Sequence, residues 1–217
     1  LVVAIPLGIY AGYKPESKVS KTIMAGSILG FSMPTFWVGI IFIMFFAVFL
    51  GWFPTTGRGE IGTFLGINSS LFTLNGLSHI FLPALNLALF KISSVIRLTR
   101  AGTREIILQD YITFARSKGL SEKRIVLVHI LKNILIPIVT VVGLEFGSLI
   151  AFSTVTETVF AWPGMGKLII DSIYNLDRPV IVAYLMIIVT FFVFLNLIVD
   201  ILYTFLDPRV RIKGDSQ

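Results

Sequence analysis

The sequence predicts an all-α integral membrane protein, a single transmembrane domain over residues 1–217 with about five spans. Of the 217 residues, 55% are hydrophobic and 14% are charged, whereas soluble domains carry roughly 25% charged residues. The mean hydropathy is +0.89. The apolar residues also gather in runs of roughly 20, the length with which a helix crosses a hydrocarbon core. No stretch between these runs is long enough for a soluble catalytic domain.

The first two predicted spans occupy the N-terminal part of the chain. Residues 1–12 are apolar, do not begin with Met, and lack the basic region and cleavage site of a signal peptide. We therefore expect them to be the end of a span whose start is missing, which makes the domain N-terminally incomplete. Residues 22–50 form a second, long run in which Pro34 and Gly39 predict a kink or a break.

Three further apolar runs, residues 79–98, 134–155 and 180–205, complete the prediction. Lys and Arg are unevenly shared among the gaps between the runs. Residues 13–21, residues 97–133 and the tail hold fourteen: Lys14, Lys18, Lys21, Arg97, Arg100, Arg104, Arg116, Lys118, Lys123, Arg124, Lys132, Arg209, Arg211 and Lys213. The other two gaps hold three: Arg58, Lys167 and Arg178. Because cytoplasmic loops are enriched in basic residues, we expect residues 99–133 and the C-terminus inside.

The composition excludes several kinds of site. The chain has no cysteine, which rules out disulfides and thiolate metal sites, and its two histidines are far apart in sequence. Membrane orientation and contact with lipid explain the net charge of +6 better than nucleic acid does. The run Gly-Met-Gly-Lys at 164–167 resembles a phosphate-binding loop, but Ala161 and Leu168 stand where that motif needs Gly and Ser or Thr. We expect no metal and no cofactor.

The basic segment, residues 99–133, has the pattern of two helices joined by a turn. Between Glu105 and Lys118 the apolar side chains recur at helical spacing and would share one face: Ile107, Tyr111, Phe114 and Ala115. Gly119 is placed to end this helix, and Ser121 to N-cap the next one. Periodicity leaves two interpretations open, a docking element for a partner or a helix held on the membrane surface by anionic lipid.

Three ionisable residues fall within predicted spans: Lys91, Glu145 and Asp200. Such residues are costly in the bilayer and usually face protein or water. We expect Asp200, near the cytoplasmic end, to pair with arginines of the loop. Glu145 either lines a translocation path or forms a bridge with Lys91.

Small residues next to Glu145 form a second pattern. Gly143, Gly147 and Ala151 recur every four residues and predict close helix packing. Glu145 lies about 200° round the helix from Gly143, which directs its carboxylate away from this packing face.

Three separated runs carry a resemblance to a known family. They are Tyr-Ile-Thr-Phe-Ala-Arg-Ser-Lys-Gly at 111–119 with its continuation to Pro137, Glu-Thr-Val-Phe-Ala-Trp-Pro-Gly-Met-Gly-Lys at 157–167, and the ending from 196 through Leu-Asp-Pro-Arg at 206–209. Together they resemble the permeases of binding-protein-dependent ABC importers, most of all the dipeptide, oligopeptide and nickel branch.

The resemblance implies a non-enzymatic, multi-pass subunit of the cytoplasmic membrane. It implies an ABC importer-type transmembrane fold of about six spans in complete members. The implied partners are two cytoplasmic ATPase subunits, a second homologous permease and an extracytoplasmic substrate-binding protein. It assigns contact with the ATPase to Tyr111, Phe114, Ala115, Arg116, Lys118 and Gly119.

Two rival functions remain open at this point. The chain could be a secondary transporter driven by protons through Glu145, Asp200 and Lys91, or a membrane scaffold that transports nothing. Within the resemblance, the cargo could be a dipeptide, an oligopeptide, a nickel chelate or a glycoside.

Overall fold

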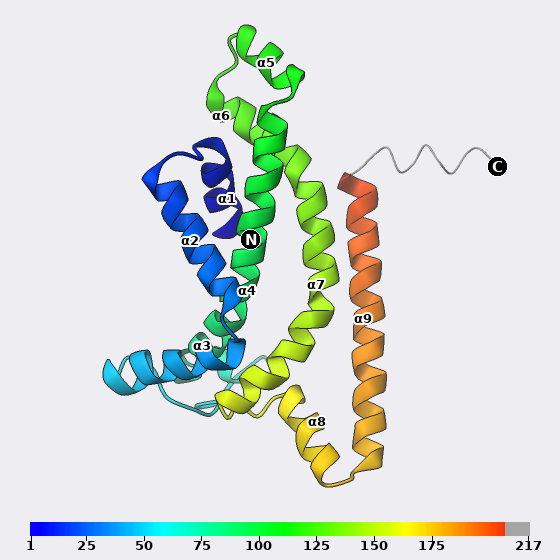
Figure 1. The fold of residues 1–217 in the computed structure, drawn as a ribbon. Coiled ribbons are helices and arrows are strands. Elements are labelled where there is room, and N and C mark those ends of the chain that lie inside the picture. The colour runs from blue at the N-terminus through cyan, green and yellow to red at the C-terminus, as the bar shows by residue number, and fades with distance from the viewer. Residues whose placement is uncertain (207–217) are drawn as a thin grey trace, which may run out of the picture. The chain divides into compact units, whose positions relative to one another are not determined.

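The protein is described from a computed structural model that covers residues 1–206, without the side chains of residues 144, 146 and 202–206. It is mainly helical, as predicted (Figure 1). The elements in chain order are α1 (Ala4–Tyr13), α2 (Lys18–Ser32), α3 (Thr35–Phe42), the π-helix η1 (Ile43–Phe49), β1 (Gly62–Phe64), β2 (Ile67–Ser69), the 3₁₀-helix η2 (Ser70–Phe72), α4 (Leu74–Ile107), α5 (Asp110–Ser117), α6 (Glu122–Arg124), the π-helix η3 (Ile125–Ile130), α7 (Leu131–Val159), α8 (Met165–Tyr174) and α9 (Arg178–Leu206).

The prediction of about five spans is too high for the described residues. Within residues 1–206, three helical stretches are long and apolar enough to cross a membrane: Leu74–Ile107, Glu122–Gly143 and Arg178–Ile201. The bent pair Lys18–Ser32 and Thr35–Phe49 gives a fourth if it is one span. Helix α1 has ten residues, about 15 Å at 1.5 Å per residue, and does not cross a membrane by itself. That it is the end of a longer span stays a prediction.

The predicted break at Pro34 is confirmed. Helix α2 ends at Ser32, and Pro34 is the N-cap residue of α3 with an extended ψ of 135°. Proline has no N–H to continue the ladder of α2, and its ring disfavours helical backbone in the preceding residue. Two helices therefore replace the single long span that hydropathy indicates.

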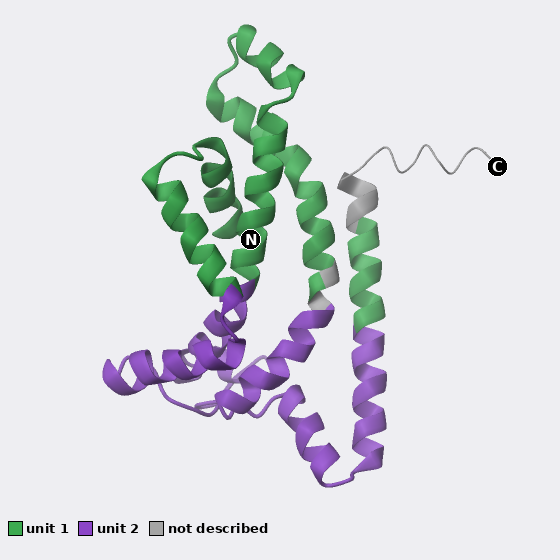
Figure 2. Cartoon of the chain, viewed as in Figure 1, with its two compact units in different colours: residues 1–31, 91–146, 192–217 green, residues 32–90, 147–191 purple. Residues whose placement is uncertain are grey.

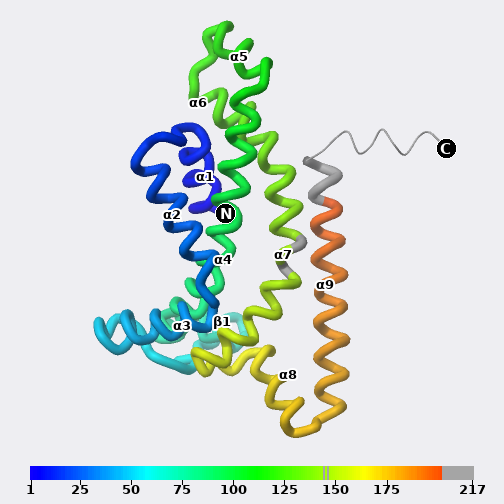
Figure 3. The backbone as a smooth tube through the Cα atoms, in the orientation of Figure 1, coloured from blue at the N-terminus to red at the C-terminus, as the bar shows by residue number. Residues whose placement is uncertain are grey.

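The chain forms two compact units, each built from separated stretches of sequence (Figure 2). Unit 1 comprises residues 1–31, 91–146 and 192–217, of which residues up to 206 are described, and unit 2 comprises residues 32–90 and 147–191. Helices α4, α7 and α9 each contribute residues to both units (Figure 2). Figure 3 traces these helices along the chain.

In unit 1, α1 packs closely against the C-terminal half of α4. A Cβ atom built on Gly8 would lie 2.5 Å from Thr99 Cβ, and one on Gly12 would lie 2.6 Å from Thr103 Cβ. Glycine at every fourth position lets two helix backbones approach this closely. The apolar core next to this contact contains Ala4, Val95, Ile96, Ile112, Ala115, Ile125, Ile130, Ile134 and Ile138.

Unit 2 has a smaller core of Ala47, Leu82 and Phe160. Helix α8, which the sequence analysis did not predict, lies in the segment between α7 and α9. The Lys167 backbone N–H, in the first turn of α8, donates a hydrogen bond of 2.8 Å to the Glu157 carboxylate. A carboxylate there satisfies a free N–H and interacts favourably with the helix dipole.

Candidate functional site

The helix–turn–helix segment is present, but its first helix is shorter than predicted. Helix α4 ends at Ile107 and α5 begins at Asp110. Gln109, between them, has an extended backbone with ψ of 143°. The prediction of one helix from Glu105 to Lys118 is therefore wrong, because the chain changes direction where that helix would have continued.

The two faces of α5 have different surroundings. Ile112 is fully buried and Ala115 is 5% exposed, and both belong to the core that contains Ile125 and Ile130. Tyr111 and Phe114 are 42% and 59% exposed. The prediction that Ala115 shares an outward face with Tyr111 and Phe114 is wrong, since Ala115 forms the inner face with Ile112.

The turn after α5 has the predicted backbone. Gly119 has φ of +78°, a left-handed conformation that suits glycine. Its N–H donates to the Arg116 carbonyl at 2.9 Å, and the Leu120 N–H donates to the Ala115 carbonyl at 3.2 Å. Ser121 occupies the N-cap position of α6, as expected, but its side chain makes no capping hydrogen bond. The ammonium of Lys118 lies 4.4 Å from the centre of the Phe114 ring, which adds a positive charge to the exposed aromatic surface.

Side chains from three elements meet beside this turn. The Tyr13 hydroxyl, at the end of α1, donates to Glu122 Oε2. Arg116 Nε, on α5, donates to Glu122 Oε1 at 3.0 Å, and Arg116 Nη2 donates to the Tyr13 hydroxyl at 3.5 Å. The hydrogen bond to Glu122 raises the pKa of Arg116 above its usual value. No sequence pattern indicates this cluster, because Tyr13 and Glu122 are 109 residues apart in the chain.

Two of the three predicted intramembrane charges form an ion pair in unit 1. Lys91 Nζ on α4 lies 3.2 Å from Glu145 Oε2 on α7. The Ser94 hydroxyl donates to Glu145 Oε1 at 3.2 Å. The Lys91 and Glu145 side chains are 16% and 23% exposed. Both carboxylate oxygens thus have a polar partner on α4, and the charge of Glu145 is balanced by that of Lys91.

The other predicted residues have mixed environments. Asp200 lies on an exposed part of α9. Gly143 is buried, and a Cβ atom there would lie 2.7 Å from two methyl carbons of Val199. Gly147 is half-buried and Ala151 is exposed. Close helix contact is therefore seen at Gly143. The ending at 207–209 that carries part of the resemblance lies outside the described residues.

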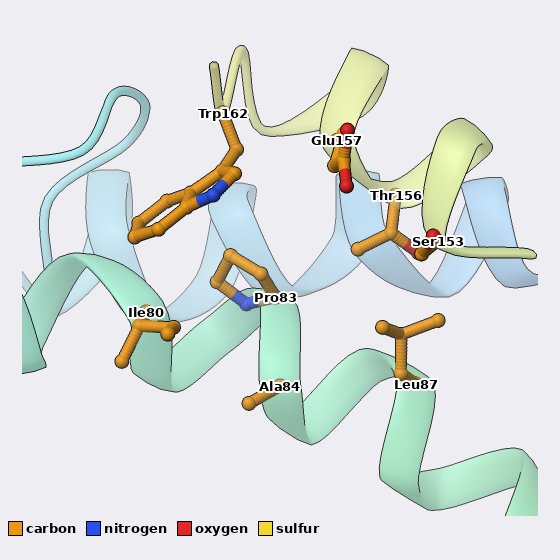
Figure 4. A pocket seen from close by; sticks show the side chains of 8 residues that line it. All are labelled: Ile80, Pro83, Ala84, Leu87, Ser153, Thr156, Glu157 and Trp162. Carbon is orange, nitrogen blue, oxygen red and sulfur yellow. The ribbon is translucent and has the colours of Figure 1, made fainter. Parts of the chain in front are cut away.

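Unit 2 contains an apolar pocket of about 200 Å³ (Figure 4). Ile80, Pro83, Ala84 and Leu87 of α4 form one wall, and Ser153, Thr156 and Glu157 of α7 face them with Trp162. The Thr156 hydroxyl accepts a hydrogen bond from Asn86 Nδ2 at 3.2 Å. The Glu157 carboxylate accepts one from the Lys167 backbone N–H in the first turn of α8. These polar groups therefore have structural partners within unit 2.

Known proteins resemble the chain along nearly its whole length. The family described as binding-protein-dependent transport system inner membrane component matches residues 4–212. The di/tripeptide transport system permease protein DppB of Pseudomonas aeruginosa is 40% identical over an alignment 217 residues long. The alignment covers 94% of this chain and 64% of the relative. The oligopeptide transport system permease protein AppB of Bacillus subtilis is 40% identical over 211 residues, covering 97% and 65%.

A more distant relative and a solved structure agree with these matches. The dipeptide transport system permease protein DppB of Escherichia coli is 35% identical over 226 residues, covering 97% of this chain and 67% of the relative. The chain thus spans about two thirds of the length of these curated relatives. A chain of the inward-facing MetNI methionine ABC transporter has a TM-score of 0.70 at 18% identity, covering 95% of this chain and 87% of its own length. At that identity the likeness shows the fold alone.

Proposed function

Because the chain belongs to the family of binding-protein-dependent transport system inner membrane components, as the three motifs predicted, we propose that it is the membrane-spanning subunit of an ATP-driven importer. Its cargo would be peptides or a related small solute, since the similar relatives are named as peptide permeases. The chain would carry out no covalent chemistry, and separate subunits would hydrolyse the ATP. The branch of the family that the sequence analysis named is the branch of these relatives.

The exposed side of α5 is the observation that supports this function best. Tyr111 and Phe114 present large apolar side chains to solvent, while Ile112 and Ala115 fix the helix to the core of unit 1. Exposed aromatic side chains beside cationic ones are typical of a protein interface. We propose that this surface, with Arg116, Lys118 and the Gly119 turn, contacts a cytoplasmic ATPase subunit.

The orientation follows from the distribution of basic residues. The segment around α5 would lie inside and the segment containing β1 and β2 outside, with the C-terminus inside. A substrate-binding protein would deliver cargo to the outer side. A second homologous permease would complete the path, and two ATPase subunits would dock on the inner side.

The Lys91–Glu145 pair bears on the proton-coupled alternative. A proton carrier needs a carboxylate that gains and loses a proton during transport. Here the Glu145 carboxylate accepts a hydrogen bond from the Ser94 hydroxyl and forms an ion pair with Lys91, so both of its oxygens are engaged by α4. We therefore propose that the pair joins α4 and α7 in the folded subunit.

The test is co-purification of the ATPase with the full-length permease, together with ATP-dependent uptake of a labelled dipeptide. Phe114→Asp should abolish both while membrane abundance stays normal, because it places a charge in an apolar contact. Leu176→Asp is the matched control, since Leu176 is 80% exposed and lies outside the α5 segment. Uptake that continues without ATP but stops with the proton gradient would establish the secondary transporter. A purified chain with neither ATPase nor uptake would support the scaffold.

A further inference from the structure

Besides a hydrogen bond of 3.3 Å from Asn133 Nδ2 on α7 to the Tyr111 hydroxyl, helix α5 has an apolar and a polar connection to the rest of unit 1. The first is apolar: Ile112 and Ala115 pack in the same core as Ile125 and Ile130, which lead directly into α7. The second is polar: Arg116 reaches Glu122 and the hydroxyl of Tyr13 at the end of α1. The same core contains Ala4 of α1 and Val95 and Ile96 of α4, so the apolar connection reaches α1 and α4 as well as the start of α7. Among the described residues, the second connection is the one that joins α5 to α1 by a hydrogen bond, across about 100 residues of sequence.

Helix α1 is in turn closely held by α4. The Gly8–Thr99 and Gly12–Thr103 approaches leave no room for a methyl group, and the Arg100 carbonyl lies 2.9 Å from a Cβ built on Gly12. Cores packed this tightly transmit displacement instead of absorbing it. A movement of Tyr13 would therefore be passed along α1 to α4, which carries Lys91.

We propose that Tyr13, Arg116 and Glu122 are positioning residues that transmit movement of α5 into the α1–α4 pair. This inference rests on the proposed function, in which an ATPase displaces α5. Movement of α5 reaches α7 along the chain, and the hydrogen bonds of Tyr13 fix the end of α1 to α5, so that α1 and α4 move with it and do not slide past it on the apolar core. Loss of the polar connection then uncouples ATP hydrolysis from transport while α5 still binds its partner.

The strength of these contacts explains why their effect is on coupling. Arg116 and Glu122 side chains are 38% and 53% exposed, and exposed ion pairs contribute little to stability. The core around Ile112 holds α5 in place without them. What the cluster supplies is a fixed geometry among the end of α1, α5 and α6.

The experiment uses the full-length complex with its ATPase and binding protein in proteoliposomes. ATP hydrolysis and uptake of tritiated alanyl-alanine are measured together. Tyr13→Phe removes one hydroxyl and should lower the peptide transported per ATP roughly fivefold, the factor expected for one ordinary hydrogen bond. ATPase co-purification and membrane abundance should not change. Tyr10→Phe is the matched control, because Tyr10 lies on the same helix and is 38% exposed.

A second variant tests whether the residues act together. Glu122→Gln should lower the ratio similarly, and the double variant with Tyr13→Phe should be no worse than either single one. An unchanged ratio in Tyr13→Phe, additive losses, or detachment of the ATPase by Tyr13→Phe would each overturn the inference. A wild-type complex that shows no bound ATPase or no ATP-dependent uptake would overturn the proposed function and this inference with it. Loss of binding in Phe114→Asp with normal binding but poor coupling in Tyr13→Phe would support both.

Discussion

Replacing Glu145 by Gln should destabilise the folded chain by about 3 kcal/mol. Lys91 and Glu145 are 3.2 Å apart, and their side chains are only 16% and 23% exposed. Removing one member of a buried pair costs roughly 3–5 kcal/mol, because the other charge stays desolvated without compensation. Partial exposure places this pair at the lower end of that range. For a chain of this size, about 3 kcal/mol lowers the melting temperature by roughly 6–12 °C.

The measurement is thermal unfolding of the purified full-length subunit in lipid nanodiscs. Lys91→Met should cost a similar amount, while Lys91→Met combined with Glu145→Gln should recover to within about 1 kcal/mol of the wild type. Ser94→Ala should cost only about 1 kcal/mol, the value of one hydrogen bond. Glu16→Gln is the control, because the Lys21–Glu16 pair is 65% and 89% exposed and should contribute nothing measurable.

Two results would refute this reasoning. If the double variant is as unstable as the sum of the single variants, Lys91 and Glu145 do not stabilise one another. If the double variant is stable but cannot transport, at least one of the two charged groups has an obligatory part in transport, and the purely structural role proposed for the pair is wrong.

Three further predictions concern local packing and orientation. Gly8→Val should destabilise the α1–α4 contact by about 1–3 kcal/mol in the same unfolding assay, since its Cβ meets Thr99, whereas Gly26→Ala, where nothing lies within 4 Å, should be neutral or stabilising. Gly119→Val should destabilise the folded chain by about 1–2 kcal/mol and reduce ATPase co-purification. Its φ of +78° is the whole cause, because a Cβ at this position contacts nothing. Normal ATPase co-purification would show that the turn is not needed for the contact with the ATPase. In intact cells an impermeant thiol reagent should label Thr63→Cys but not Ser121→Cys, and the reverse pattern would invert the proposed orientation.

Features that depend on local backbone chemistry were predictable from the sequence. Pro34 marks the break because proline lacks an N–H, whatever surrounds it. Gly119 marks the turn because positive φ strains any residue with a side chain. The pairing of Lys91 with Glu145 was one of two open alternatives, since charges within apolar helices need a partner or water. Hydropathy was less reliable for helix ends, because polar residues continue a helix as readily as apolar ones, and α4 therefore extends beyond its apolar run.

Contacts between distant residues were not predictable in the same way. Ile112 and Ala115 face the core, and Tyr111 and Phe114 face outward, although all four are compatible with an apolar helix face. The spacing of Gly8 and Gly12 was a readable signal of helix packing, but the sequence does not identify Thr99 and Thr103 as the opposing residues.

The sequence by itself predicted a helical membrane protein of the binding-protein-dependent transport family, because the length of the apolar runs, the distribution of basic residues and three motifs are all features of the residue order. Only the tertiary structure decided which side of α5 is free, that Glu145 pairs with Lys91, and that Tyr13 meets Arg116 and Glu122. The physical reason is that a helix surface offers several faces of similar composition. Which face is buried depends on the partner that packs against it, and here that partner lies as far as 109 residues away.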